Sequence, residues 1–512
     1  MNLSWIDITT ILVFVSFVIG LSLYKSRQKK KTSEDYFLAS RNLIWYLIGF
    51  SLIASNISTE QFVGMSGQSA GHVGMAVASY EWIAAITLVI VALFFLPKFL
   101  KSGIFTIPEF LEHRYSPAPR AIMAFYTVII YVAVTIAAVL YSGGLTLQTI
   151  FGIDLTTAVW IIAIVAALYT TIGGLRAVVW ADLITGSALI IGGIATLILG
   201  FIAVGGVSQF FQTNADRLHM ILPANHIEIP WTALIIGIWI PNFYYWGLNQ
   251  FIMQRTLGAK SLRQGQMGVI LAAGLKLLIP FIVVFPGIMA LQLFGNQMTT
   301  TDQAYPLLIK NLIPVGLKGF IFAALFGAVM GSLDSMLNSA STIFTMDIFK
   351  RHIKKEASPK TLITIGRIMT VLFVLIGCFI APQLGNPKFQ GIFHYIQDFQ
   401  GYISPGILAA FVFGLIVKRA PSSAAITALL LNVPVYGLLH LKRFDNIVFL
   451  NKMAITFGIL VAAMAVITLI KPLKMPKILA RRGEIDLKPA PAALWLGLLI
   501  IALTICLYII FW

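Results

Sequence analysis

Apolar runs of about 18 to 25 residues recur from one end of the chain to the other, and each can cross a hydrocarbon core about 30 Å thick. In that solvent every backbone N–H and C=O group needs a partner within the protein, which favours helices. The composition agrees, because 59% of the 512 residues are hydrophobic, 11% are charged and the mean hydropathy is +0.90. We therefore predict an all-α membrane protein with about fourteen transmembrane helices. The expected spans are residues 5–24, 43–65, 75–96, 121–151, 156–172, 182–204, 231–251, 268–291, 315–344, 362–381, 393–417, 424–439, 451–470 and 492–512.

The basic residues are distributed unevenly between the two sides that this topology creates. The formal net charge is +17, and with the N-terminus placed outside, the inward side collects 28 of the 36 Lys and Arg residues. The largest groups lie at residues 25–31, 350–355 and 471–488. This asymmetry follows the positive-inside rule and predicts that both termini lie outside. It also removes nucleic acid as the reason for the positive charge.

Two of the expected spans are interrupted at mid-depth by residues that favour turns. The second span contains the sequence Ala-Ser-Asn-Ile-Ser-Thr-Glu-Gln at 54–61, and the seventh contains Pro241 and Asn242. These breaks lie five helices apart, which predicts two groups of five helices with opposite orientation, as in inverted-repeat transporters. The alternative is that both are ordinary kinks. The predicted organisation is a leading helix and basic loop at 1–42, repeats at 43–205 and 206–419, and three final helices at 420–512.

Ionisable residues inside the spans point to a polar cavity, because each costs about 2.5–3.5 kcal/mol at a helix centre. The candidates are Glu81, Asp182, Lys276, Asp334 and Asp398. Glu81 and Lys276 lie deep in their spans, so we expect them to form a structural ion pair or to share a polar ligand. Neutral polar and aromatic residues accompany them: Asn56, Gln61, Asn242, Gln397, Tyr80, Tyr245, Trp246 and Phe393. Amides and charges beside flat apolar faces suit a polyhydroxylated ring.

One face of the ninth span carries small residues, with Ala328, Gly331, Ser332 and Ser335 at helical spacing. Carbonyls of a broken helix together with serine hydroxyls would give the all-oxygen shell that Na⁺ prefers. Close helix packing is the alternative explanation. The spans contain no His-Glu metal motif, Ser-His arrangement or phosphate-binding loop, so we do not expect an enzyme.

Several ordered blocks of the chain resemble the sodium:solute symporter family, most closely its bacterial sodium/galactose branch. They are residues 51–67 (SLIASNISTEQFVGMSG), 78–82 (ASYEW), 173–182 (GGLRAVVWAD), 244–257 (YYWGLNQFIMQRTL), 338–348 (NSASTIFTMDI) and 395–397 (YIQ). The resemblance implies a LeuT-type fold with one extra helix before the first repeat. It implies sodium-coupled symport of galactose or glucose by alternating access, in the inner membrane of a bacterium.

The resemblance also implies roles for individual residues of the cavity. The sugar would be hydrogen-bonded by Gln61, Glu81, Asn242, Lys276 and Gln397, with Asn56 supporting the broken helix. Tyr245, with Trp246 beside it, would form the inner gate, and Met65, Tyr80 and Phe393 would form the outer lid. One position departs from the pattern, because galactose-binding members carry Ser where this chain has Ala84. The choice between sugar epimers therefore stays open.

The implied sodium site departs from the family pattern in a second way. It would use the carbonyls of Ala54, Ile57 and Ala328 with the side chains at 331 and 332, but Gly331 replaces a serine. Asp334 stands where relatives have Ser, Thr or Ala. We hypothesise that Asp182, Asp334 and Ser335 form a second site for Na⁺ or a proton. The alternative is that Asp334 faces water in the inner vestibule.

Other readings of the same sequence stay open at this stage. A symporter of myo-inositol, sialic acid or an amino acid, driven by sodium or protons, would have a similar helix pattern. A membrane sensor built on a transporter scaffold is a candidate from another class. The expected partners are a monosaccharide, Na⁺ and the lipid bilayer, and the sequence leaves the ion-to-sugar ratio and the oligomeric state open.

Overall fold

The computed structural model describes residues 4–25, 35, 38–173, 175–386, 391–481 and 485–512, and within these ranges every regular element is helical. The first half comprises α1 (Trp5–Lys25), α3 (Trp45–Asn56), α4 (Ser66–Ala70), α5 (Ser79–Ile90), α6 (Leu96–Ser102), α7 (Ile107–Arg114), α8 (Pro117–Ile130), α9 (Ala137–Phe151), α10 (Leu155–Gly173), α11 (Leu175–Ala203) and α12 (Val207–Thr213). The second half comprises α13 (Trp231–Ile235), α14 (Trp239–Phe243), α15 (Gln250–Leu257), α16 (Leu262–Lys276), α17 (Ile279–Phe294), α18 (Ala304–Leu312), α19 (Leu317–Ile343), α20 (Pro359–Ile380), α21 (Ile392–Gln400), α22 (Ser404–Ile416), α23 (Ser422–Leu438), α24 (Phe449–Ile470) and α25 (Pro491–Ile510).

Wider π-helical turns and short 3₁₀ turns join these helices. The π-helical stretches are η2 (Glu60–Met65), η4 (Val91–Phe95), η5 (Tyr131–Ile136), η7 (Tyr244–Leu248) and η10 (Phe344–Ile353). The 3₁₀ turns are η1 (Ala39–Arg41), η3 (Gly74–Ala78), η6 (Ala215–Arg217), η8 (Gly295–Gln297), η9 (Thr301–Gln303), η11 (Ala381–Gly385) and η13 (Lys442–Phe444). Stretches of π-helix are frequently found at functional sites.

Fewer helices qualify as continuous spans than the fourteen expected from the sequence. In the described ranges nine helices are long and apolar enough to cross a membrane, or ten if α21 and α22, which meet at 46°, count as one. Two further apolar helices are shorter, at Leu155–Ala167 and Ser422–Leu438. The expected spans 43–65 and 231–251 are both interrupted, which is why neither qualifies by length. The exact count of fourteen stays a prediction.

The first interruption lies where the turn-forming residues predict it. The N–H of Ile57 makes the last helical hydrogen bond of α3, to the carbonyl of Ile53. The next donor, the N–H of Ser58, turns back to the carbonyl of Asn56, and the N–H of Gln61 donates to Ser58. Helical hydrogen bonding therefore stops after Ile57 and resumes in η2.

The second interruption is displaced from the predicted position. Pro241 and Asn242 lie inside the short helix α14, and the chain leaves helical geometry on either side, at Ile236 and at Asn249. Pro241 falls in the first turn of α14, where the missing N–H of proline removes no helical hydrogen bond. The prediction of a break at Pro241–Asn242 is therefore wrong in position, although the span is broken.

A third bend, between α21 and α22, has no counterpart in the sequence-based expectations. Asn432 of α23 fastens it, because its side-chain amide donates to the carbonyls of Gly401 and Tyr402 and its oxygen accepts from the N–H of Gly406 at 2.9 Å. One amide from a neighbouring helix thus satisfies backbone groups that the bend releases, as a bend in lipid requires.

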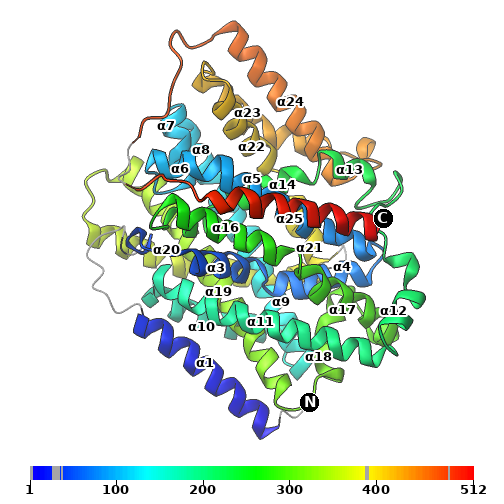
Figure 1. Cartoon of the computed structure of the whole chain (residues 1–512). Helices are drawn as coiled ribbons and strands as arrows, with labels where there is room; N and C mark the ends of the chain where they lie inside the picture. Colours follow the sequence, from blue (N-terminus) through cyan, green and yellow to red (C-terminus); the bar gives the residue numbers. More distant parts are fainter. Residues whose placement is uncertain (1–3, 26–34, 36–37, 174, 387–390, 482–484) are drawn as a thin grey trace.

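The first broken helix lies at the centre of the bundle. The helix α3 packs against α11, α16 and α19, while α1 lies along α11 and α19 on the outside (Figure 1). The final helix α25 crosses α5 and α16, and α23 and α24 pack against α22. The centre of the bundle is therefore formed by the two broken stretches and the helices that cover them.

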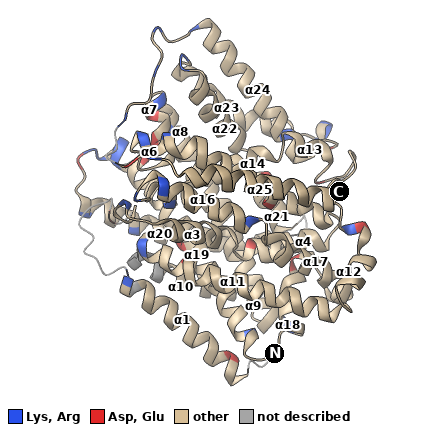
Figure 2. Cartoon of the chain, viewed as in Figure 1, with Lys and Arg blue, Asp and Glu red and all other residues tan. Residues whose placement is uncertain are grey.

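Charge is concentrated at one end of the bundle (Figure 2). Lys and Arg residues gather along the left edge of the view, near α6, α7 and α8, whereas the marks for both chain ends lie toward the right. Arg27 and residues 29–31, which contribute to the predicted charge asymmetry, lie outside the described residues. We call the two ends the basic end and the terminal end.

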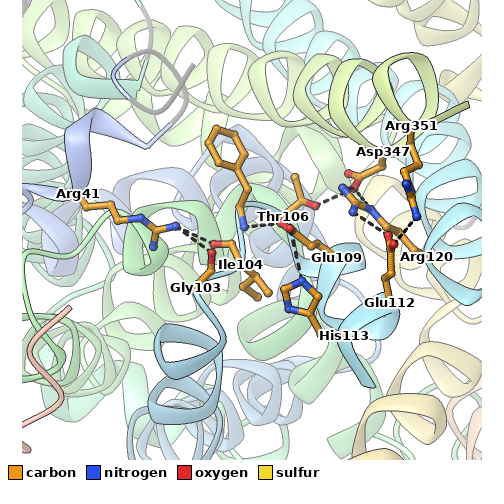
Figure 3. A network of polar contacts seen from close by, with 11 residues as sticks. Arg41, Gly103, Ile104, Thr106, Glu109, Glu112, His113, Arg120, Asp347 and Arg351 are labelled. Carbon is orange, nitrogen blue, oxygen red and sulfur yellow. Dashed lines mark hydrogen bonds and ion pairs between the residues drawn. The ribbon is translucent and has the colours of Figure 1, made fainter. Parts of the chain in front are cut away.

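A polar network holds the helix ends together at the basic end (Figure 3). Arg120 of α8 bridges Asp347 of η10 at 2.6 Å and Glu112 of α7 at 2.9 Å, and Arg351 contacts the other oxygen of Glu112 at 2.6 Å. Partial burial opposes ionisation of Glu112, but the two guanidinium groups outweigh it and lower its pKa. Thr106 adds a hydrogen bond to Asp347 at 2.9 Å.

Close packing of α17 against α4 leaves no room for a side chain at Gly287. A Cβ atom there would overlap the Ser69 hydroxyl and the carbonyl oxygen of Ser66. We expect Gly287→Ala to destabilise the fold by about 1–3 kcal/mol, as overpacking does, and to lower the thermal unfolding midpoint in detergent. Gly458→Ala is the matched control, since a Cβ there meets nothing within 4 Å. Equal midpoints for the two variants would contradict this account of the packing.

Candidate substrate and cation sites

A cavity of about 580 Å³, including its opening, lies between the two broken stretches. It is lined by Asn56, Glu60, Gln61, Tyr80, Glu81, Thr135, Pro241, Asn242, Tyr245, Trp246, Phe251, Met336, Phe393, Ile396, Gln397 and Gln400. Three of the five π-helical stretches in the described ranges, η2, η5 and η7, contribute to this lining.

A chain of polar contacts runs along one wall of the cavity. The ammonium group of Lys276 contacts both the carboxylate of Glu81 and the side-chain oxygen of Asn56. The amide of Asn56 donates to the Tyr245 hydroxyl at 3.2 Å, and the amide of Gln61 lies 3.5 Å from the second oxygen of Glu81. The two broken stretches therefore share one hydrogen-bonded array.

Lys276 supports this array from behind the cavity surface. It is the last residue of α16, where the carbonyl end of the helix favours a positive charge. The side chain is fully buried, Glu81 is 3% exposed, and the ammonium group lies 4.7 Å from the ring centroid of Trp246. The predicted pairing of Glu81 with Lys276 is present, and Glu81, not Lys276, lines the cavity.

Aromatic residues of the lining pack against one another in two groups. Tyr80 and Phe393 meet edge to face with centroids 5.0 Å apart, near the starts of α5 and α21 toward the terminal end. Tyr245 packs on Trp246 at 5.0 Å and on Phe251 at 5.5 Å. Met65, also expected in the outer lid, is fully buried at the end of η2 and is not among the residues that line the cavity.

Sequence reasoning overlooked one charged residue of the cavity. Glu60 lines it, is 6% exposed, and accepts a short hydrogen bond from the Ser58 hydroxyl. Its position inside the first interruption was a usable signal, since a carboxylate within a span is a site candidate by default. Thr135, Phe251, Met336, Ile396 and Gln400 were also not expected, because their spacing does not set them apart from packing residues.

The arrangement of the expected sodium ligands suits a cation. The hydroxyl of Ser332 is fully buried and has no hydrogen-bond partner among the described residues. The N–H groups that would normally bond the carbonyls of Ala54 and Ile57 are those of Ser58 and Gln61, and both donate elsewhere. The Ser332 hydroxyl and these two carbonyls are oxygens of the kind that a hard cation prefers, and Ala328 is buried on α19.

The acidic residues near this position are divided between two environments. One oxygen of Asp182 accepts from Ser51 at 2.5 Å and lies 3.2 Å from the guanidinium of Arg255. The other lies 2.9 Å from the place that a Cβ of residue 331 would occupy. Gly331 therefore leaves room for this carboxylate beside the expected sodium ligands.

Ser335 and Asp334, both expected in the second cation site, have different surroundings in the structure. Ser335 accepts from Arg255 at 2.7 Å and donates to the carbonyl of Gly331 at 2.6 Å. Asp334 is 1% exposed and lines a mostly apolar cavity of about 550 Å³ beside α1, which Gly331 also lines. Arg255 was not expected in this cluster, because it lies four residues beyond the end of the predicted seventh span.

Asp398, the remaining ionisable candidate, lies outside the cavity wall and anchors α21. It accepts from the Tyr436 hydroxyl at 2.7 Å and contacts His440 at 3.0 Å. The hydrogen bond that His440 donates to Asp398 raises the pKa of His440. The charge-assisted form of this contact is present below the ordinary pKa of histidine and is lost as pH rises through the raised value.

The chain is similar to known sodium-coupled transporters. Residues 36–432 match the sodium:solute symporter family. The chain is 43% identical over 463 residues to the sodium/glucose cotransporter of Vibrio parahaemolyticus, covering 85% of this chain and 84% of the relative. It is 33% identical to the sodium/myo-inositol cotransporter 2 of Oryctolagus cuniculus, covering 83% of this chain and 68% of the relative.

A solved structure shares the fold. It is a substrate-bound, outward-open Na⁺-coupled sialic acid symporter, with a TM-score of 0.81 and 23% identity over 93% of this chain and all of that one. The relatives are transporters and not enzymes. The family resemblance found in the sequence is thus confirmed. This multi-pass membrane protein belongs to the sodium:solute symporter family and couples the movement of a solute to Na⁺.

Proposed function

We propose that the chain transports a monosaccharide, glucose or galactose, together with Na⁺. The observation that carries this proposal is the polar array from Gln61 through Glu81 and Asn56 to Tyr245, set opposite aromatic faces in one cavity. Sugar hydroxyls both donate and accept hydrogen bonds, so carboxylate and amide groups can serve them together. Their C–H faces pack on rings such as those of Tyr245 and Trp246. The 43% identical sodium/glucose cotransporter supports the same substrate class.

The charge of the cavity favours a neutral solute over an anion. Lys276 is already paired with Glu81, and Glu60 adds a second carboxylate to the lining. A carboxylate-bearing solute such as sialic acid would need a cation that is not already neutralised. Myo-inositol has only hydroxyl groups and is the alternative substrate, which the myo-inositol relative supports.

The proposed sodium site provides the coupling. Its ligands are the carbonyls of Ala54, Ile57 and Ala328 and the hydroxyl of Ser332, so that Na⁺ joins α3 to α19. Binding there stabilises the end of α3, which carries Asn56 into the substrate cavity. Sodium thereby raises sugar affinity, and sugar raises sodium affinity by the same factor.

Alternating access then follows from the two aromatic closures. Tyr80 and Phe393 close the cavity toward the terminal end, which we assign to the outside because the opposite end is basic. Tyr245 closes it toward the basic end. In this orientation both termini lie on the outer side of a bacterial inner membrane. A membrane potential of 100 mV contributes about 2.3 kcal/mol for each charge carried inward.

A second cation site is proposed beside the first. Gly331 lines the same cavity as Asp334 and lies beside one oxygen of Asp182, and Ser335 donates to the carbonyl of Gly331. Two nearby carboxylates can hold Na⁺ or share a proton.

Uptake into proteoliposomes tests the function. We expect labelled glucose or galactose to accumulate under an inward sodium gradient, because Na⁺ organises the site, and not under a potassium gradient. Unlabelled glucose, galactose, myo-inositol and sialic acid should compete in proportion to their fit, with sialic acid the weakest. Accumulation that ignores the sodium gradient would contradict sodium coupling. Competition by myo-inositol alone would replace the sugar assignment.

Variants of the ion pair separate stability from recognition. Lys276→Met or Glu81→Gln alone should cost about 3–5 kcal/mol, because each leaves a buried charge unpaired. The double variant should recover most of the thermal stability yet transport sugar poorly, since the carboxylate of Glu81 and the ammonium group that orients it are gone. Lys452→Met, a buried lysine of α24, is the control. Sugar uptake by the double variant at the wild-type rate would contradict the proposed site.

The two cation sites differ in the variants that affect them. Ser332→Ala should raise the half-saturating Na⁺ concentration about tenfold, equivalent to roughly 1.4 kcal/mol, without altering the pH profile. Asp334→Asn should change how uptake depends on Na⁺ concentration if the second site binds sodium. It should change how uptake depends on pH if the site binds a proton. If Asp334→Asn leaves both profiles unchanged, Asp334 simply faces the vestibule and the second site does not exist.

A further inference from the structure

The buried guanidinium group of Arg255 contacts four separate parts of the bundle. It donates to Ser51 at 2.5 Å and to Ser55 of α3, to Ser335 of α19 at 2.7 Å, and to Asp182 of α11 at 3.2 Å. It also donates to the carbonyl of Phe251 in its own helix, α15. The side chain of Arg255 is 1% exposed.

These contacts join α3 and α19, which carry the proposed sodium ligands, to α15, which follows the proposed inner gate at Tyr245. Ser51 and Ser55 are one turn apart and precede Asn56, which contacts the Tyr245 hydroxyl. Arg255 lies on α15, which follows the η7 stretch containing Tyr245 after the break at Asn249. The two broken helices are therefore connected twice, inside the cavity and again one to two turns toward the basic end.

A second buried arginine shows what a purely structural contact looks like in this fold. Arg114 is also 1% exposed, but among the described residues it donates only to backbone carbonyls, those of Gly414 at 2.6 Å, Val417 at 2.6 Å and Ala420 at 3.4 Å. All three lie at the end of α22 and in the turn after it. Arg255, by contrast, bonds side chains from three other helices.

We propose that Arg255 is the positioning residue through which Na⁺ occupancy reaches the substrate cavity. The inference rests on the proposed function, because it takes Na⁺ to lie between α3 and α19. Na⁺ holds these two helices together, and the guanidinium links the same two helices to α15. The planar fork of arginine can reach the serines of α3, Ser335 and Asp182 together, whereas the single ammonium group of lysine cannot.

The charge balance explains why this link belongs in the core. Asp182 neutralises Arg255, so the guanidinium leaves no uncompensated positive charge beside a bound Na⁺. The second oxygen of Asp182 faces Gly331 and stays available to the cation region. When Na⁺ leaves, α3 and α19 are no longer held together by the ion, so the hydrogen bonds of Arg255 to these two helices no longer position α15 and the preceding Tyr245.

Sugar binding to the purified full-length protein tests the proposal. The dissociation constants of glucose and galactose are measured by calorimetry in saturating NaCl and in choline chloride. We expect sodium to tighten wild-type binding at least about fivefold, within the usual range of such couplings. In Arg255→Lys, and separately in the Ser51→Ala, Ser55→Ala double variant, the factor should fall below about twofold, with sodium-free affinity unchanged.

Arg114→Lys is the matched control and should keep the wild-type sodium factor, although it too loses hydrogen bonds. The serine variants retain the ion pair and so provide an answer even if Arg255→Lys does not fold. A wild-type sodium factor retained in the serine variants would overturn the role of Arg255 while leaving sodium coupling intact. A factor of one in the wild-type protein would overturn the proposed coupling itself.

Discussion

The need to satisfy every backbone polar group inside the hydrocarbon shapes this molecule more than any other constraint. A continuous helix meets that need by itself, and most of the bundle is built that way. Where α3 stops after Ile57, the freed groups must find partners or a ligand, and here the N–H of Ser58 turns back to Asn56 while two carbonyls lose their helical donors. The break creates both a polar cavity and candidate cation ligands because it cannot be left unsatisfied.

Buried charges beside the breaks need partners, just as the buried backbone groups do. Lys276 and Glu81 lie on helices that flank the broken stretches, and each would be costly alone. Paired, and with Asn56 bonded to the ammonium group, they form a neutral wall that still offers carboxylate and amide groups to a solute. Arg255 and Asp182 repeat the arrangement nearer the basic end, with serine hydroxyls in place of the amides.

Small residues decide how closely these polar groups approach the cation region. Gly331 leaves space that one oxygen of Asp182 borders at 2.9 Å from the Cβ position, and Gly186, one turn later on α11, lets that helix pack on Ala54. A side chain at position 331 would crowd this carboxylate, so glycine keeps the oxygen of Asp182 accessible. Asp334, on the same helix, adds a second acid to the wall of the neighbouring cavity.

The sequence by itself determined the features that depend on the bilayer as solvent. Hydropathy gave the helical class, charge asymmetry gave the basic end, and turn residues at 54–61 located the first break, because each follows from local composition. The ordered family blocks identified the transporter family and most of the cavity residues. The sequence misplaced the second break: Pro241 suggests a break until its position in the first turn of α14 is known, whereas the chain leaves helical geometry at Ile236 and Asn249.

Only the tertiary structure decided which distant residues meet. The contact of Arg255 with Ser51, Asp182 and Ser335 joins residues up to 204 positions apart, and no periodicity encodes it. The same holds for Glu60, which the structure turns into the cavity, and for Met65, which it leaves outside the lining. Hydropathy acts locally along the chain, whereas hydrogen bonds between broken helices depend on how the whole bundle packs.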